Sequence, residues 1–372
     1  MASPALRNNC AICGTKDIKK IMSIKDMPVY MGVSEKNDGY LFEDMIFCEC
    51  ANCGNIQLGR LLDPNIVYSH NHNVEIVGEL WRTHYFRLLD FIGYAIKDKT
   101  VLEIGDPSAK IAKLTEIYKK WIIVEKNTHL ESTEKIIFKK AFFDDEFYVE
   151  EKIDVIIHSH LLEHIYEPIR FFNKCRNILS DDGDIFFSIP NMKFFIDNNY
   201  SPNSILQFEH TYYIDAHYVQ RICDSAGFRI VKTEYFNNHS VFFHLKKDIT
   251  KVRDYDCISL SERFSNLFEI HKSKIDEINE IISEEAAVFI YGAHITSQFY
   301  IFNGLNSLKI NGVLDGSISK INKYLYGTNL KTFGAEEIIK YDDAVVIVSH
   351  MGIYVEEISK QLKSIKNNIR LL

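Results

Sequence analysis

The sequence predicts an α/β protein in three parts: a cysteine-rich module, a central doubly wound domain and a smaller α/β domain. Three observations support this fold class. Two Cys-x-x-Cys pairs lie within the first 53 residues, apolar strands alternate with helical stretches from about residue 100, and the alternation returns after residue 286. We therefore expect domains at 1–66, 67–250 and 286–372, with a connecting helix at 251–285.

The cysteines of the first part have the spacing of a metal site. Cys10-Ala-Ile-Cys13 and Cys50-Ala-Asn-Cys53 offer four thiolates, which suit tetrahedral zinc with no ligand position left for water. The alternatives are free structural cysteines, or Cys48 as the ligand in place of Cys50. We favour Cys50, because only Cys50 completes a two-residue spacer with Cys53. The sequence thus predicts a structural Zn²⁺ ion that folds a segment too small for a core of its own.

The central part begins with a helix and continues as alternating strands and helices. Apolar residues at helical spacing predict a helix over 74–97. Apolar runs predict strands at 100–105, 120–127, 152–160, 183–191, 228–236 and 239–247, with a helix around 171–178. This alternation implies a mostly parallel sheet, and such sheets bind ligands at the carboxyl ends of their strands.

The third part repeats the pattern on a smaller scale. A connecting helix is predicted over 258–284, followed by strands at 287–294, 308–316 and 343–350 and a closing helix at 355–365. We expect this part to be a second, smaller α/β unit.

The first two central strands end in residues that suit a nucleoside ligand. Gly105 lets the backbone approach a cofactor closely, and an acid such as Glu125 commonly holds two ribose hydroxyls. Ordinary turn chemistry is the alternative for each residue alone. The chain continues as Asp106-Pro107, which suits a helix start but lacks the glycine-rich loop that a pyrophosphate needs. This favours a cofactor without phosphate, such as S-adenosylmethionine.

Histidines and acids gather after the third strand and again near residue 210. The first group is His158-Ser-His160-Leu-Leu-Glu-His164, and the second contains Glu209-His210. Imidazole titrates near neutrality and can take a proton from carbon or oxygen. A structural role is the better interpretation of one isolated histidine, but the set predicts that at least one is catalytic.

Charge and hydropathy exclude other classes of function. The formal net charge is −8 and the lysines are interspersed with acids, so we expect no nucleic-acid partner. No window approaches 18 uninterrupted apolar residues, so we expect no membrane span. The N-terminal stretch has no apolar signal core, and clustered cysteines favour a metal over disulfides, which predicts a cytoplasmic protein.

Several further motifs occur along the chain, in the following order. They are Cys50-Ala-Asn-Cys53-Gly54-Asn-Ile-Gln57-Leu58, Tyr68-Ser69, Leu102-Glu103-Ile104-Gly105, Leu161-Leu162-Glu163-His164-Ile165, Glu209-His210, Tyr291-Gly292-Ala293, and Leu314-Asp315 with Lys320, Lys323 and Tyr326-Gly327-Thr328. In these motifs the chain resembles, over nearly its full length, the zinc-containing, S-adenosylmethionine-dependent sugar C-methyltransferases, which act on nucleotide-linked ketosugars.

The resemblance implies a Rossmann-like methyltransferase domain and a role for each motif residue. His210 would be the base, beside Glu209, with His164 and Tyr68 lining the site. The cofactor would be held by Glu103, Gly105, Glu125 and His160. The sugar nucleotide would lie near Gln207, His294, Lys323 and Tyr326, under the C-terminal domain. The implied reaction is proton removal beside a ketone, giving an enolate that takes the methyl group.

The chain departs from the family pattern at three places. Gln207-Phe208 replaces a Tyr-His pair, Ser108-Ala109 replaces an acid and a glycine, and Asn238-His239 replaces a Gly-Gly pair. Methylation of oxygen or nitrogen therefore stays open. Two further alternatives are a sugar-nucleotide enzyme with other transfer chemistry and a non-catalytic binding protein.

Overall fold

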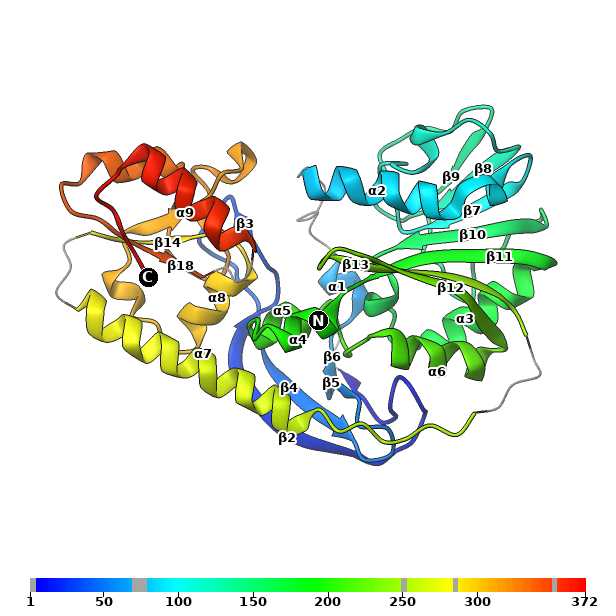
Figure 1. Cartoon of the computed structure of the whole chain (residues 1–372), viewed down its shortest axis with the longest axis horizontal. Coiled ribbons are helices and arrows are strands. Elements are labelled where there is room, and N and C mark those ends of the chain that lie inside the picture. The colour runs from blue at the N-terminus through cyan, green and yellow to red at the C-terminus, as the bar shows by residue number, and fades with distance from the viewer. Residues whose placement is uncertain (1–4, 69–78, 249–252, 284–286, 350–352) are drawn as a thin grey trace.

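The computed structural model describes residues 5–68, 79–248, 253–283, 287–349 and 353–372. Within these ranges the chain forms two lobes, one around the large central sheet and one from the C-terminal residues (Figure 1). The long N-terminal strands β2 and β4 lie beneath both lobes. Ser69 and the predicted helix start at 74–78 lie outside the described residues.

The N-terminal part is built on a three-stranded antiparallel sheet in the order β2-β4-β5. Its elements are β1 (Ala5–Leu6), β2 (Ile18–Pro28), β3 (Val33–Ser34), β4 (Phe42–Cys50), β5 (Ile56–Leu58), β6 (Arg60–Leu61) and α1 (Pro64–Val67). Alternate residues of β4, such as Met45 and Phe47, are buried. Phe47 packs on Phe264 and Phe268 of the later helix α7 (Ser261–Ile282), so this sheet shares its core with the C-terminal lobe.

The central lobe holds a seven-stranded sheet in the order β12-β13-β11-β10-β7-β8-β9 among the described residues. Its strands are β7 (Thr100–Ile104), β8 (Lys120–Val124), β9 (Ile136–Lys139), β10 (Ile153–Ser159), β11 (Leu179–Pro190), β12 (Phe228–Phe236) and β13 (Ser240–Lys247). Pairs from β9 to β11 are parallel, and β13 is antiparallel to both neighbours. The chain order turns outward from β7 in both directions, so the topological switch point lies between β7 and β10.

The two faces of this sheet belong to different apolar clusters. Val101 of β7 packs with Leu88 and Phe91 of α2 (Glu79–Ile92), whereas Leu102 faces the cluster of α3 (Pro168–Ile178) and α6 (Ala216–Ala226). This alternation follows from the two-residue period of a strand. The central strands are apolar on both faces, as expected for a sheet covered on both sides.

One predicted element is wrong. Pro107 suits a helix start, but residues 105–119 are all described and contain no α-helix, only the 3-10 turn η2 (Ala112–Leu114). Asp106 accepts hydrogen bonds from the backbone N–H groups of Ser108 and Lys110, which closes a tight turn instead. Ala109 then takes φ = 54°, outside the helical range, so the chain cannot continue as a helix.

The C-terminal lobe contains a five-stranded parallel sheet in the order β17-β15-β14-β18-β19 among the described residues. Its elements are β14 (Val288–Tyr291), α8 (Ile295–Phe302), β15 (Gly312–Leu314), β16 (Tyr324–Leu325), β17 (Thr332–Phe333), β18 (Val345–Val348), α9 (Ile353–Ile365) and β19 (Arg370–Leu371). The predicted strands and the helix at 355–365 match these elements. The predicted domain boundaries stay predictions.

A small sheet and one amide side chain join this lobe to the N-terminal part. Strand β16 pairs antiparallel with β3, placing Tyr324 opposite Ser34. The amide of Gln298 donates hydrogen bonds to the carbonyls of Tyr30 and Tyr326, both at 2.9 Å, and accepts one from the N–H of Gly32. Buried hydrogen bonds of a side-chain amide hold the C-terminal lobe in a fixed position on the N-terminal part.

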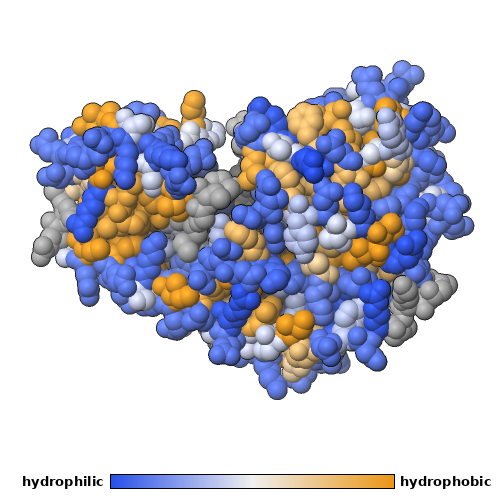
Figure 2. Space-filling model, viewed as in Figure 1, coloured by the Kyte–Doolittle hydropathy of each residue, from blue (hydrophilic) through white to orange (hydrophobic). Residues whose placement is uncertain are grey.

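The surface face in Figure 2 mixes hydrophilic residues with smaller apolar groups. Within the described ranges, no helix has both the length and the apolar character that a membrane crossing needs.

Candidate active site

The four predicted metal ligands lie together at one end of the N-terminal sheet. The Sγ atoms of Cys10 and Cys53 are 3.6 Å apart, and those of Cys13 and Cys50 are 3.5 Å apart. A disulfide needs about 2.05 Å, whereas four sulfurs at about 2.3 Å from one zinc ion stand roughly 3.8 Å apart. Cys48 is not in this group of described ligand atoms. The donor set therefore fits a tetrahedral Zn²⁺ ion and favours Cys50 over Cys48.

A glycine follows each cysteine pair in the left-handed region. Gly14 has φ = 72° and Gly54 has φ = 74°, so each pair ends in the same tight turn. Space around Gly14 is open, but a Cβ on Gly54 would stand 2.0 Å from the carbonyl oxygen of Ile258. The segment that leads into α7 therefore lies directly on the second cysteine pair.

The predicted cofactor residues lie at the carboxyl end of β7, beside the switch point. Glu103 is buried, and its Oε2 accepts a 2.7 Å hydrogen bond from the indole of Trp121. Burial, followed by the nearby Asp106, raises the pKa of Glu103 well above its ordinary value. Gly105 has φ = 85°, and the Leu161 side chain lies 3.1 Å from the position of a Cβ there.

A polar cavity of about 50 Å³ opens at this edge, lined by Tyr85, Glu103, Ile104, Gly105, Asp106, Pro107, Lys110 and Ser159. Such a volume holds a few water molecules. The cavity is thus smaller than a nucleoside, and Leu161 packs against Gly105 beside it. Glu125 directly follows β8 and accepts a 2.7 Å hydrogen bond from the N–H of Asn127, and burial raises its pKa.

The predicted catalytic residues form one group in space, although they come from three segments. Tyr68 Oη lies 3.1 Å from Nδ1 of His164, and Glu209 Oε2 lies 3.9 Å from the same nitrogen. The rings of His164 and His210 meet edge-on with centroids 4.7 Å apart. Glu163 joins the group, with Oε1 4.0 Å from Nε2 of His164.

Burial sets the protonation of this group. It lowers the pKa of His210 to about 4, so the imidazole is neutral near pH 7 and can accept a proton. It raises the pKa of Tyr68 well above its ordinary value, with Glu209 adding to the effect, so the phenol stays a donor. It also raises the pKa of Glu163 to about 8. Nδ1 of His210 and both oxygens of Glu163 are buried without a hydrogen-bond partner.

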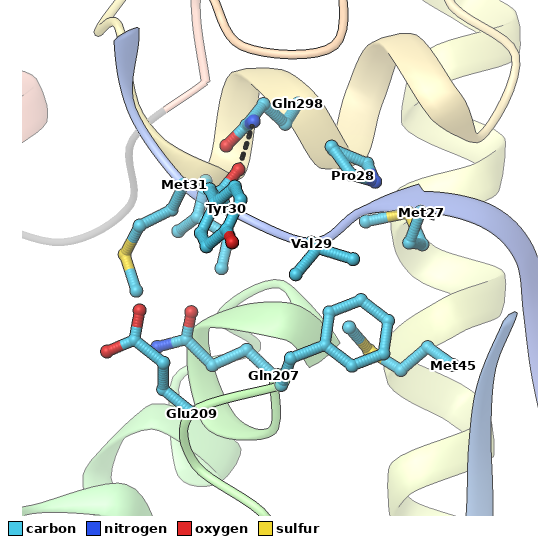
Figure 3. A pocket seen from close by; sticks show the side chains of 11 residues that line it. Met27, Pro28, Val29, Tyr30, Met31, Met45, Gln207, Glu209 and Gln298 are labelled. Carbon is cyan, nitrogen blue, oxygen red and sulfur yellow. Dashed lines mark hydrogen bonds between the residues drawn. The ribbon is translucent and has the colours of Figure 1, made fainter. Parts of the chain in front are cut away.

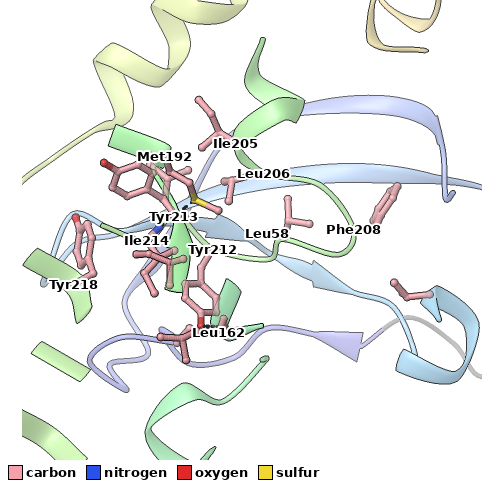
Figure 4. Packing of buried hydrophobic residues seen from close by; sticks show 14 of the residues in the cluster. Leu58, Leu162, Met192, Ile205, Leu206, Phe208, Tyr212, Tyr213, Ile214 and Tyr218 are labelled. Atoms are coloured by element: carbon pink, nitrogen blue, oxygen red, sulfur yellow. Dashed lines mark hydrogen bonds between the residues drawn. The ribbon is translucent and has the colours of Figure 1, made fainter. Parts of the chain in front are cut away.

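Strand β5 of the N-terminal part holds the segment that carries Glu209 and His210. The N–H of Leu58 donates to the carbonyl of Thr211, and the N–H of Tyr213 donates to the carbonyl of Ile56, both at 2.8 Å. Figure 4 shows Leu58 beside this segment and Tyr212 reaching toward Leu162, whose carbonyl accepts its hydroxyl. Strand β5 begins three residues after Cys53, so the backbone that pairs with this segment directly follows the second cysteine pair.

A second opening lies between this segment and the N-terminal part. Figure 3 shows Gln207 and Glu209 facing Tyr30 and Met31 across a cavity of about 10 Å³, with Gln298 behind Tyr30. Glu209 is 3 % exposed, so its carboxylate is held out of bulk water.

The structure brings His160 into a different group. Its Nε2 lies 2.8 Å from the Ser240 hydroxyl, which also contacts His84 and His239. Burial lowers the pKa of His84 to about 3 and of His239 to about 4, and that of His160 well below its usual value. All three imidazoles are thus neutral near pH 7.

The predicted substrate residues of the C-terminal lobe have varied surroundings. His294 is exposed at the start of α8. Lys323 pairs with Glu35 at 2.9 Å, and the buried Tyr326 accepts a 2.7 Å bond from the N–H of Leu41. These contacts tie Lys323 and Tyr326 to the N-terminal part, and their role toward a substrate stays a prediction.

Sequence reasoning gave no role to Glu163, His84 or His239. Glu163 lies within a motif, but nothing in the sequence indicates that its carboxyl is buried without a hydrogen-bond partner. From the sequence pattern, His84 is a single polar residue on an apolar helix, and His239 is a residue of a turn. Only the fold brings His84 and His239 to the end of β10.

Comparisons with known proteins agree with the central fold. Residues 76–233 match a family described as "Methyltransferase domain". No curated protein matches this sequence.

Three solved structures illustrate the level of structural similarity. A putative S-adenosylmethionine dependent methyltransferase from Listeria monocytogenes is 14% identical, with TM-score 0.36, over 46% of this chain and 100% of that chain. The 1,6-didemethyltoxoflavin-N1-methyltransferase of Burkholderia thailandensis is 13% identical, with TM-score 0.39, over 53% and 97%. An S-adenosylmethionine dependent methyltransferase from Mesorhizobium loti is 10% identical, with TM-score 0.39, over 45% and 100%. The family match confirms the prediction of a methyltransferase: residues 76–233 form a methyltransferase domain.

Proposed function

We propose that the protein transfers a methyl group from S-adenosylmethionine to a nucleotide-linked ketosugar, with base-assisted chemistry at Glu209 and His210. The observation that carries this proposal is the meeting of Tyr68, His164, Glu209 and His210 beside a methyltransferase domain. A ketone substrate needs a base, a donor for its developing oxyanion and protection from water.

The residues of the site suit these tasks. S-adenosylmethionine, when bound, supplies an electrophilic methyl group. The neutral His210 accepts the proton from the carbon beside the ketone, because its buried imidazole is unprotonated near pH 7. Tyr68 keeps its proton and can donate it in a hydrogen bond to the ketone oxygen. His164, 3.1 Å from the Tyr68 hydroxyl, orients it.

For the cofactor we propose the edge of β7 and β8. Glu103, Gly105, Glu125 and His160 lie at or next to the carboxyl ends of neighbouring strands, where such sheets bind ligands. The four cysteines would hold a structural Zn²⁺ ion. Eight free cysteines and a thiolate metal site suit a reducing compartment, so we propose that the protein works in the cytoplasm.

Calorimetry with S-adenosylmethionine and S-adenosylhomocysteine is the direct test of the cofactor. We expect both to bind to the full chain. Absence of binding by both would overturn the proposal.

Deuterium exchange tests the base separately from methyl transfer. In D₂O, a nucleotide-linked ketosugar should take up deuterium at the carbon beside its ketone in the presence of the protein. His210→Gln should slow this exchange by roughly 10²–10⁴-fold, the usual contribution of a general base. The exposed His129→Gln is the matched control and should exchange at the wild-type rate. Exchange that His210→Gln leaves unchanged would remove His210 from the mechanism.

One set of observations favours a second candidate, an enzyme of sugar nucleotides that does not use this cofactor. In residues 105–119, all described, the crossover after β7 has no α-helix, and the cavity at Gly105 is about 50 Å³. This candidate predicts deuterium exchange without binding of S-adenosylmethionine. The two experiments together therefore separate the candidates.

A further inference from the structure

Three histidines from distant segments converge on one buried hydroxyl. Ser240 Oγ lies 3.0 Å from Nδ1 of His84, 2.8 Å from Nε2 of His160 and 2.5 Å from Nδ1 of His239. The three histidines offer ligand nitrogens within 4.8 Å of one another. They come from α2, the end of β10 and the turn before β13. The Trp81 ring packs against all three, with centroids 4.5–5.2 Å apart.

Hydrogen bonding explains this convergence only in part. A hydroxyl donates one hydrogen bond and accepts two, so two of the imidazoles must direct an N–H at Ser240. If His160 does so through Nε2, its Nδ1 carries a lone pair. That lone pair faces Oε1 of Glu163 at 3.6 Å, which is itself an acceptor unless protonated. Both oxygens of Glu163 are buried, and neither forms a hydrogen bond in the structure.

A metal ion resolves this arrangement. We propose that His84, His160 and His239 bind one divalent transition-metal ion in place of the hydrogen bonds to Ser240. Neutral imidazoles are the usual ligands of Zn²⁺ and related ions, and three of them form a known zinc donor set. The proposal does not depend on methyl transfer.

The surroundings supply the partners that metal-bound histidines need. A ligand histidine normally donates its other N–H to a carboxylate or another acceptor. For His160 that acceptor is Glu163, and for His84 it is the Ser159 hydroxyl, 2.9 Å from Nε2. An ionised Glu163 would also offset the charge of the ion, which a buried cation requires. The proposed site thus gives the Glu163 carboxyl a function, as the hydrogen-bond acceptor of a ligand histidine.

Position and access fit the proposal as well. His84 is fully buried, but His239 is partly exposed on a turn, which offers a route for an ion. Ser159 also lines the cavity beside Gly105, so the ion would lie next to the cofactor edge. His160 has φ = 48°, a conformation that is uncommon outside glycine and is frequent at functional sites. The group Glu163–His164–His210 belongs to the candidate active site, and it adjoins the three histidines through the 3.6 Å contact between Glu163 and His160.

Cobalt titration tests the proposal on the full chain. Protein that holds one zinc ion in its cysteine site is titrated with Co²⁺ and followed by absorption, with metal content measured by mass spectrometry. We expect one further ion per chain, with visible ligand-field bands but without the near-ultraviolet thiolate band that cobalt in the cysteine site would give. A wild-type protein that takes up no further ion would overturn the proposal.

Variants then assign the ion to these residues. His239→Asn should abolish uptake of the further ion, and Glu163→Gln should weaken Co²⁺ binding by roughly 10–100-fold, as loss of an outer partner does. His129→Asn, on an exposed loop, is the matched control and should bind as wild type does. Circular dichroism checks that each variant is folded. Unchanged binding in folded His239→Asn would overturn the assignment, and unchanged binding in Glu163→Gln would overturn the role of that carboxyl.

Discussion

Glu163 is a residue whose protonation should affect the stability of the folded chain. Burial raises its pKa to about 8 in the folded chain, whereas an exposed glutamate titrates near about 4.3. The folded chain therefore binds this proton more tightly than the unfolded chain. The contribution of Glu163 to stability is fully present below about pH 4 and is lost as the pH rises through about 8.

Glu163→Gln removes this titration, because glutamine is neutral at every pH. Relative to wild type, its free energy of unfolding should gain about 2–3 kcal/mol between about pH 6 and about pH 8. Urea unfolding at one zinc equivalent per chain measures this. The exposed Glu167→Gln is the control and should show no such trend. A pH-independent difference for Glu163→Gln would show that the carboxyl is already ionised.

Leu161 packs against Gly105. Its side chain lies 3.1 Å from the place of a Cβ on that glycine, where a nucleoside cofactor would approach the backbone. Leu161→Ala should bind S-adenosylmethionine several-fold more tightly in calorimetry, because no side chain has to be displaced. Leu161→Met, which keeps the volume, should bind as wild type does. Weaker binding by Leu161→Ala would mean that Leu161 contacts the cofactor.

At the scale of elements, the two cysteine turns offer a matched pair. Gly14→Ala and Gly54→Ala place the same side chain at nearly the same backbone angle, with φ values of 72° and 74°. Gly14→Ala should cost about 1–2 kcal/mol, the cost of a left-handed alanine. Gly54→Ala should cost clearly more, because its Cβ would overlap the carbonyl of Ile258. Denaturant unfolding compares them, and equal costs would show that the segment before α7 moves away freely.

The sequence predicted those elements whose patterns are local. The strand at 228–236 matches β12 residue for residue, and the run at 120–127 contains β8. The helix expected after Gly105 is absent from the described residues 105–119, because Asp106 closes a turn and Ala109 takes a positive φ. Turn chemistry of this kind competes with helix capping by the same residue types.

At the scale of the whole molecule, the sequence could predict that the cysteines form one cluster. It could not predict which part of the central lobe packs next to that cluster. The pairing of β5 with residues 211–213 joins segments about 150 positions apart, which no local pattern encodes. The same holds for the joining of β3 with β16 and for the three histidines around Ser240. The candidate catalytic group could be predicted because its residues lie within motifs, whereas His84 and His239 do not.

Loss of the proposed Zn²⁺ ion from the cysteine site should therefore act on the candidate active site through structure. We expect Cys50→Ser to lower hydrogen-exchange protection at the N–H groups of Leu58 and Tyr213. These two groups form the hydrogen bonds between β5 and residues 211–213. Activity should fall together with protection. Cys223→Ser, buried in α6 and far from the ligands in sequence, is the control. Activity lost while protection stays intact would place the metal in the chemistry.

The joint made by Gln298 also decides how the protein can be divided for experiments. A fragment that ends at residue 285 would lose the hydrogen bonds that Gln298 forms with the Tyr30 carbonyl and the Gly32 N–H. It would also expose more of Phe42, which is already 39 % exposed and packs on Phe302. Backbone groups that have lost hydrogen bonds, next to exposed aromatic surface, favour aggregation. A shortened chain without the C-terminal lobe is thus a poor target for expression, and crystallisation should begin from the whole chain.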